Sequence, residues 1–317
     1  MGLLGGSDDA DRAEELYEIA RNSPAAAADH VEELASLLKG SGPPARTRAA
    51  DALYHTAGAR PERVAEVVDV LLTHLADDDV NARRRTADAL VAVAGGYPRT
   101  FAAWVESLVP VLSTTDPYVR AAVACVLAHL AASGPSTVLP AVDELRAATT
   151  DEEEWDVRVY ATGALADVAE RYPEEAAPVV PDAVANAREP VPALQVVAVD
   201  LLAAVAVADP SAASTEADEV FAELLREGAV EQRVAAACAT GRVAVERPRR
   251  MQRSVSELAT TTADDEERVR LAAATASVRV AQHHPDAVDL DDDAAQRLRG
   301  LADDLDVSVE RVLGPPD

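Results

Sequence analysis

Two groups of arginines in the sequence have types and spacing that could do chemistry. The first is the stretch ERPRRMQR, which contains Arg247, Arg249, Arg250 and Arg253. Four guanidinium groups within seven residues could bind a phosphate or an acidic tail. Local charge balance against the neighbouring glutamates is the alternative interpretation, and we favour it.

The second arginine pattern runs along the chain at a spacing of 37 or 38 residues. It consists of Arg46, Arg83, Arg120, Arg158, Arg233 and Arg270, with Gln195 at the position between the fourth and the fifth. Six guanidinium groups in register could form a ladder that binds anions. They could instead pair with acids near the neighbouring turns, which are Asp79, Asp116, Asp156 and Glu267. We favour this structural role.

The histidines and cysteines do not indicate a catalytic or metal site. His283 and His284 stand at the predicted end of a helix, where a positive charge is favourable. The sequence contains no Gly-rich phosphate loop and no HExxH or GxSxG motif. Cys125 and Cys238 lie far apart, which fits two ordinary thiols in a reducing cytoplasm. We therefore predict a cytoplasmic protein that is not an enzyme and has no metal and no cofactor.

The composition limits the possible partners. The 317 residues carry a net charge of -27 from 56 acidic and 29 basic residues, and Lys39 is the single lysine. Because acids are spread along the whole chain, non-specific binding to nucleic acid or anionic lipid is disfavoured. Hydrophobic residues make up 49% of the chain but aromatic residues only 3%, and the apolar runs are too short to span a membrane.

Regularly spaced prolines indicate an internal repeat, and the helices of this repeat must hold the residues of any functional site in place. They are Pro24, Pro61, Pro98, Pro135, Pro173, Pro210, Pro248 and Pro285, and successive members differ by 37 or 38 residues. The arginine column keeps the same period. A period of this length is typical of a solenoid, whose units bury their apolar faces against their neighbours.

Each repeat predicts two helices, the second of which begins near the recurrent arginine. Asp116 and Pro117 are a helix start, with the aspartate as cap and the proline in the first turn. Small apolar residues then recur at the spacing of one buried helical face. In one repeat these are Val123, Ala124, Val126, Leu127, Leu130 and Ala131.

The second helices resemble those of HEAT repeats, which share a pattern of the form DxxVRxxAxxAL. The stretches DPYVRAAVACVL and DEERVRLAAATAS match it best, and EPVPALQVVAVDLL is a degenerate copy. The resemblance implies an all-α, right-handed superhelix of about seven helix pairs with capping helices. It also implies that the recurrent arginine bonds an acid or carbonyl of the adjacent repeat. The acidity and the replacement of lysine by arginine resemble proteins of halophilic archaea.

The recurrent prolines and arginines define the expected boundaries of the repeats. We expect an N-terminal cap at 1–24, seven repeats, and a C-terminal cap at 286–317. The expected repeats are 25–61, 62–98, 99–135, 136–173, 174–210, 211–248 and 249–285.

HEAT-type solenoids serve as scaffolds, adaptors, transport receptors and more rarely enzymes. The HEAT-type deoxyhypusine hydroxylases carry repeated His-Glu dipeptides, which this sequence lacks. The resemblance therefore implies a scaffold or adaptor that binds another protein along the inner face formed by the second helices. A HEAT-type enzyme or accessory lyase is the alternative, and anion or nucleic-acid binding through Arg247–Arg253 is a second one.

The inner face carries an uncharged strip in an otherwise acidic chain. Its residues fall between the buried rows of the second helices, and we expect them to face solvent and a partner. They are Ala122, Cys125, His129, Tyr160, Val197, Ala235 and Cys238. If the array is steeply curved, the strip is instead buried against itself.

Overall fold

The computed structural model describes residues 5–150, 153–209, 215–288, 295–296 and 299. Every regular element in these ranges is an α-helix or a 3-10 helix (η), so the predicted all-α solenoid fold is confirmed. The chain divides into two compact units, one formed by residues 1–148 and 152–164 and the other by 149–151 and 165–317. The division into seven repeats stays a prediction, and most of the expected C-terminal cap lies outside the described residues.

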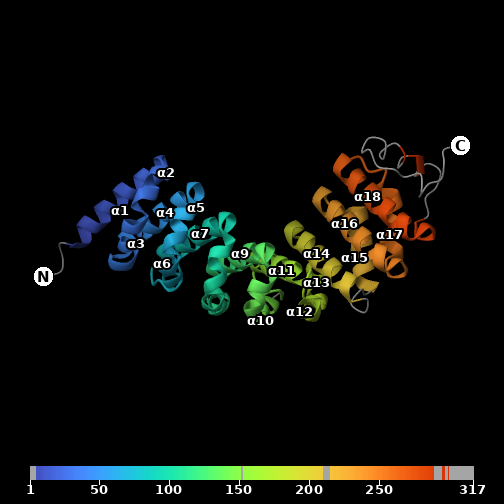
Figure 1. Ribbon diagram of the computed structural model, residues 1–317, viewed down its shortest axis with the longest axis horizontal. Helices are drawn as coiled ribbons and strands as arrows, with labels where there is room; N and C mark the ends of the chain where they lie inside the picture. The colour runs from blue at the N-terminus through green and yellow to red at the C-terminus, as the bar shows by residue number, and fades with distance from the viewer. Residues whose placement is uncertain (1–4, 151–152, 210–214, 289–294, 297–298, 300–317) are drawn as a thin grey trace. The chain divides into compact units, whose positions relative to one another are not determined.

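Long helices packed in series form the framework of the first unit. They are α1 (Gly5–Asn22), α4 (Pro43–Ala59), α7 (Val80–Gly96), α9 (Pro117–Ser133) and the first part of α11 (Trp155–Ala169). Helix α4 packs against both α1 and α7, and α9 packs against α7 (Figure 1). Helix α1 therefore takes the place that a second helix occupies in the repeats that follow.

The first helices of the repeats are less regular than the sequence led us to expect. In the first unit they are α2 (Pro24–Ala27), η1 (Ala28–His30), α3 (Val31–Gly40), α5 (Pro61–Val64), η2 (Ala65–Val67), α6 (Val68–Thr73), η3 (His74–Ala76), η4 (Pro98–Trp104), α8 (Val105–Leu108), η5 (Val109–Ser113), η6 (Pro135–Ala141) and α10 (Val142–Ala147). Pro140 lies inside η6 and Pro110 lies in the first turn of η5, and neither residue has an amide donor for a helical hydrogen bond.

Local signals explain where the second helices begin and end. Asp79 and Asp116 cap α7 and α9, and their carboxylates accept hydrogen bonds from the amides of Ala82 and Tyr118. At the other end, α9 stops before Gly134 and Pro135, and the proline occupies the first turn of the next segment. These signals hold the second helices of successive repeats in one register.

The core consists mainly of alanine, valine and leucine. The six residues predicted to form the buried face of α9 are each no more than 1% exposed. Phe101 and Phe221 are the two largest fully buried side chains among the described residues. Small side chains let neighbouring helices pack closely, so the interior needs few aromatic rings to fill it.

The second unit repeats the same construction. It contains α12 (Pro173–Ala176), η7 (Ala177–Val179), α13 (Val180–Asn186), α14 (Pro192–Ala208), α15 (Thr215–Glu227), α16 (Val230–Glu246), η8 (Pro248–Arg250), α17 (Gln252–Thr261), α18 (Glu267–His283) and η9 (Pro285–Ala287). Helix α16 packs against α14 and α18. At Gly241 the approach to α18 is so close that a Cβ atom would lie 2.8 Å from the Cβ of Ala276. None of the described helices is both long enough and apolar enough to cross a bilayer.

Candidate binding groove

A groove of about 530 Å³ runs over the second helices of the first unit. We call it the aromatic groove. It is lined by Tyr54 of α4, by Asp88, Val91 and Ala92 of α7, by Tyr118, Ala121, Ala122 and Cys125 of α9, and by Trp155, Asp156 and Tyr160 of α11. Four successive second helices therefore contribute to one concave surface.

The repeat register brings these side chains together. Tyr118 lies two residues before Arg120, and Asp156 lies two residues before Arg158, so both occupy the same position in successive repeats. Because equal positions in a solenoid lie on neighbouring helices, each repeat adds one row of side chains to the groove.

The aromatic groove collects exposed rings from a chain that has few. Two Trp, six Tyr and two Phe make ten aromatic residues, and four of the ten line this groove. Trp155 is 53% exposed, Tyr118 42%, Tyr54 37% and Tyr160 36%. Clustered exposed apolar side chains with a polar rim are typical of binding surfaces, and aromatic residues are enriched in such surfaces.

A hydrogen bond joins two walls of the groove. The Tyr118 hydroxyl donates to Oδ1 of Asp88, and Arg85 donates to Oδ2 of the same carboxylate at 3.1 Å. Partial burial and the hydrogen bond to Asp88 raise the pKa of Tyr118 to about 12. Tyr118 is therefore a neutral ring held in a fixed position, with its edge tied to α7.

The floor of the groove contains a thiol that is protected from solvent. Cys125 is 6% exposed, and burial raises its pKa even though Tyr160 forms a hydrogen bond with it. Burial is also the main cause that raises the pKa of the Tyr160 hydroxyl, and Cys125 adds to the effect. A protonated, covered thiol is a poor nucleophile, so Cys125 serves as part of the floor.

The charged residues that line the groove are all negative. Asp88 and Asp156 are its charged members, and no arginine or lysine lines the groove. Asp156 accepts a hydrogen bond from the Val157 amide at 2.8 Å. Within the ranges that the structure describes, no cationic side chain is placed to pair with Asp156.

The structure brings part of the predicted uncharged strip into the groove. Ala122, Cys125 and Tyr160 line it, whereas His129 is exposed outside it. The expectation that Ala122 and Cys125 point at solvent is wrong, because they are 9% and 6% exposed and form a covered floor. In the second unit Val197 and Ala235 are partly exposed and Cys238 is exposed.

Sequence reasoning missed the aromatic walls of the groove. Tyr118 and Trp155 precede the recurrent arginine, whereas the predicted buried face and the predicted uncharged strip begin after it. Tyr54 lies eight residues after Arg46, at a position that belongs neither to the predicted buried face nor to the predicted uncharged strip. The scarcity of aromatic residues was the available signal, since few of the ten rings are needed for a core of small side chains.

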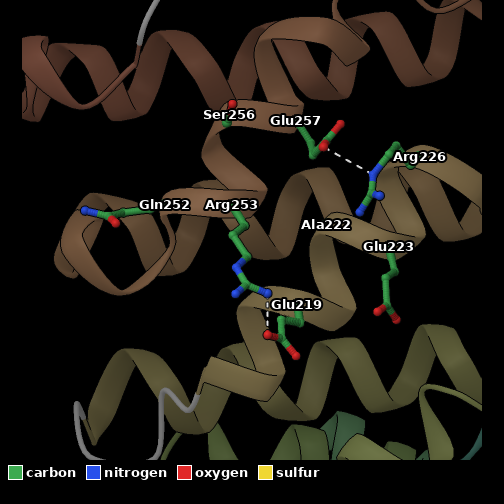
Figure 2. Close-up of a pocket in the computed structure, with 8 residues that line it drawn as sticks. All are labelled: Glu219, Ala222, Glu223, Arg226, Gln252, Arg253, Ser256 and Glu257. Atoms are coloured by element: carbon green, nitrogen blue, oxygen red, sulfur yellow. Dashed lines mark hydrogen bonds and ion pairs between the residues drawn. The ribbon is translucent and has the colours of Figure 1, made fainter.

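A second pocket, of about 410 Å³, lies in the second unit between α15 and α17. In Figure 2 Arg253 points toward Glu219, and Arg226 points toward Glu257. Their ion pairs lie next to Glu223, which also lines the pocket. An anion here would displace existing pairs and meet three carboxylates, which favours charge balance over anion binding at this pocket.

Of the four clustered arginines, Arg253 alone lines that pocket. Arg247 donates to the carbonyl of Glu246 at 3.3 Å. Arg249 and Arg250 lie exposed in η8. The four arginines therefore do not converge on the pocket between α15 and α17, and anion binding by this cluster stays a prediction.

The recurrent arginines join successive repeats. Their acidic partners are Asp77 for Arg46, Asp116 for Arg83, Glu153 for Arg120 and Asp264 for Arg233. Each of these four arginines also donates to a carbonyl five or six residues before it. Arg270 bonds the carbonyls of Asp264 and Asp265, and Arg158 is buried at 7% exposure.

Three of the four acids that we expected to pair with the recurrent arginines do not do so. Asp79 caps α7, Asp156 faces the aromatic groove, and Glu267 begins α18. The arginines pair with Asp77, Glu153 and Asp264 instead. Each of these acids lies in the loop before the next second helix, two or three residues before the acid that was expected. Where glutamine replaces the arginine, the Gln195 amide donates to the carbonyl of Ala187 at 3.2 Å.

The fold and groove define an all-α helical-repeat protein with a candidate surface for an extended ligand. No group of three or more His, Cys, Asp or Glu side chains is placed to bind a metal ion in the described ranges. The adaptin N-terminal region family matches residues 103–312, and the chain belongs to this family.

Similarity to solved structures is at the level of the fold. An engineered protein from a structural genomics consortium has a TM-score of 0.71 and 23% identity, over 94% of this chain and 79% of that chain. A designed armadillo repeat protein in complex with the peptide (KR)4 has a TM-score of 0.56 and 17% identity, over 66% of this chain and 98% of that chain. No curated protein matches the sequence.

Proposed function

We propose that this protein is a non-catalytic scaffold or adaptor that binds an extended segment of another protein in the aromatic groove. The observation that carries the proposal is the gathering of four of the ten aromatic residues on one concave surface of the first unit. Aromatic side chains supply much of the binding energy of protein interfaces and cost little conformational entropy when they are fixed. A peptide lying across the second helices would contact them in succession.

The fold supports this proposal. Helical-repeat proteins present extended concave surfaces, because each repeat adds a similar row of side chains. The designed armadillo repeat protein of related fold is seen in complex with a peptide. For the present chain we propose the same kind of ligand, and the polar and aromatic lining supports it.

The other functions considered have less support. An enzyme would need an activated nucleophile or an acid–base pair in a cavity, whereas the groove holds a covered thiol, neutral tyrosines and two carboxylates that are already hydrogen-bonded. Anionic ligands or nucleic acid would meet Asp88 and Asp156 in the groove and glutamates in the second pocket. We also propose a cytoplasmic location, on the two free thiols.

Affinity capture from a lysate of the source organism tests the proposal, with bound proteins identified by mass spectrometry. Trp155→Ala removes the most exposed ring of the groove and should leave the fold intact. Tyr97→Ala is the matched control, since Tyr97 is 45% exposed and lies outside the groove. We expect a partner that is retained by the wild type and by Tyr97→Ala and lost by Trp155→Ala. Equal retention by both variants contradicts the proposal.

A further inference from the structure

We propose that the segment bound in the aromatic groove is cationic and that its arginine side chains make the main contacts. This inference rests on the proposed function and specifies the chemistry of the partner. Three independent features of the first unit lead to it: the charge of the lining, the kind of aromatic surface, and the spacing of the rings along the helices.

The charge of the groove favours a cation. Its two charged lining residues, Asp88 and Asp156, are carboxylates, and the whole chain carries a net charge of -27. Arg85 already pairs with Asp88, but Asp156 is bonded to a backbone amide alone within the described residues. A partner guanidinium would complete the hydrogen bonding of Asp156, because it offers several donors in a planar fork.

The exposed rings suit the same ligand. A guanidinium group is attracted to the face of a tyrosine or tryptophan ring, and arginine stacks on such faces better than lysine does. The chain itself shows this contact, since the Arg84 guanidinium lies 5.4 Å from the centre of the Tyr118 ring and Arg48 lies 4.7 Å from that of Tyr17. Arg84 does not line the groove, so the groove side of Tyr118 is available to a ligand.

The spacing of the rings sets the length of the segment. Tyr54 lies on α4 and Trp155 on α11, so the groove crosses three steps between neighbouring second helices. With about 8–10 Å between packed helices, three steps cover roughly 24–30 Å. An extended chain rises about 3.3 Å per residue and needs roughly eight residues for this distance. A single side chain or a small cation would leave most of the rings unused.

An apolar helix is a weaker fit as the occupant. A helix would need an apolar groove free of charge to bury its hydrophobic face. Asp88 already pairs with Tyr118 and Arg85, but Asp156 would lose water without gaining a partner, which is costly for a carboxylate. An acidic segment would face the same two carboxylates and their repulsion.

Isothermal titration calorimetry with a pair of octapeptides tests the inference. One peptide alternates arginine and serine, and the other replaces each arginine by citrulline, which has a similar shape and no charge. We expect the arginine peptide to bind at least tenfold more tightly than the citrulline peptide at 0.5 M KCl. This salt concentration screens general attraction between the peptide and the acidic surface. Equal binding of the two peptides overturns the inference.

Two double variants locate the binding. Asp88→Asn with Asp156→Asn removes both groove carboxylates and should weaken binding of the arginine peptide at least tenfold. Asp69→Asn with Glu106→Gln removes the same charge from two exposed residues of the first helices and should change binding less than twofold. Equal weakening by the two double variants would show general electrostatic attraction and overturn the inference.

Further variants keep the test decisive. If the double groove variant fails to fold by circular dichroism, Asp156→Asn alone is used, since asparagine can still accept the hydrogen bond from the Val157 amide. Tyr118→Phe keeps the ring and should bind the arginine peptide within about threefold of the wild type, whereas Tyr118→Ser should lose most of the affinity. Loss of the partner in the capture experiment with Trp155→Ala, together with equal binding of both peptides, would leave the proposed function standing and remove the inference.

Discussion

Arg46 donates hydrogen bonds from Nε and Nη2 to the two carboxylate oxygens of Asp77, at 2.7 and 2.8 Å. The Asp77 side chain is 5% exposed and that of Arg46 19%. The pair links α4 to the loop before α7, and a third bond from Arg46 to the Ser41 carbonyl ties it to its own repeat. This contact connects one repeat to the next and recurs with other acids farther along the chain.

Replacing Arg46 by methionine should lower the free energy of unfolding by about 2–3 kcal/mol, because the largely buried Asp77 carboxylate would lose its cation. Chemical denaturation measures the change. Arg63→Met is the control, since Arg63 pairs with Glu66 at the surface and such pairs contribute less than about 1 kcal/mol. Similar losses in the two variants would contradict a special role for the Arg46–Asp77 link.

The same pair has a defined pH dependence. Burial tends to raise the pKa of Asp77, but the hydrogen bonds from Arg46 and the Asp79 amide outweigh it and hold the pKa below its ordinary value. A lowered pKa means that the stabilisation is present above the ordinary aspartate range and is lost as the pH falls through the folded-state pKa. The stability difference between wild type and Arg46→Met should therefore shrink in strong acid.

Replacing each of two glycines by alanine should change the stability of the protein in opposite directions. Gly241→Ala should destabilise the second unit by about 1–3 kcal/mol, because its Cβ would collide with that of Ala276 on α18. Gly58→Ala should stabilise the first unit by up to about 1 kcal/mol, because nothing lies within 4 Å of the added methyl group and alanine favours the helix. Thermal unfolding measures both, and an unchanged or higher midpoint for Gly241→Ala would contradict the packing at Gly241.

Asp167 should lower the stability of the protein at neutral pH. Burial, and then the negative charges of Glu170 and Asp200, raise its pKa. A raised pKa means that the charged form is disfavoured in the folded state, so stability decreases as the pH rises through the aspartate range. Asp167→Asn should therefore raise the melting temperature at pH 7, and the gain should disappear near pH 3. Asp182→Asn, a change at a partly exposed residue, should have little effect at either pH.

Salt should stabilise the protein strongly if its acidity is an adaptation to a saline cytoplasm. The net charge of -27 produces self-repulsion in dilute buffer, which about 2–3 M KCl would screen to within a few ångströms. We expect a higher thermal midpoint by circular dichroism in that salt than in dilute buffer. Equal midpoints would contradict the adaptation.

The solenoid could be predicted because two columns of residues with one period mark the second helices independently. Asp116, Pro117 and the closing Pro135 define the limits of α9, and the buried face between them follows from its spacing. The first helices were predicted less well, because Pro110 and Pro140 lack the amide donor that a continuous helix needs, and short α and 3-10 segments form where apolar periodicity predicts one helix.

The site could be predicted only in part. Ala122, Cys125 and Tyr160 were expected to share one surface, and they do line one groove. The walls formed by Tyr118 and Trp155 were not predicted, because both residues lie in the first turn of a helix and the predicted strip begins after the recurrent arginine. Exposure of a floor residue also depends on the rings above it, which spacing along one helix does not reveal.

A photo-crosslink from the groove tests directly whether the aromatic groove binds a protein segment. The crosslinking residue benzoylphenylalanine takes the place of Tyr160 in one protein and of Tyr97 in another, and the crosslinked peptides are mapped by mass spectrometry. We expect a single partner segment, rich in arginine, crosslinked from position 160 and absent from position 97. No crosslink from position 160, or the same products from both positions, would contradict it.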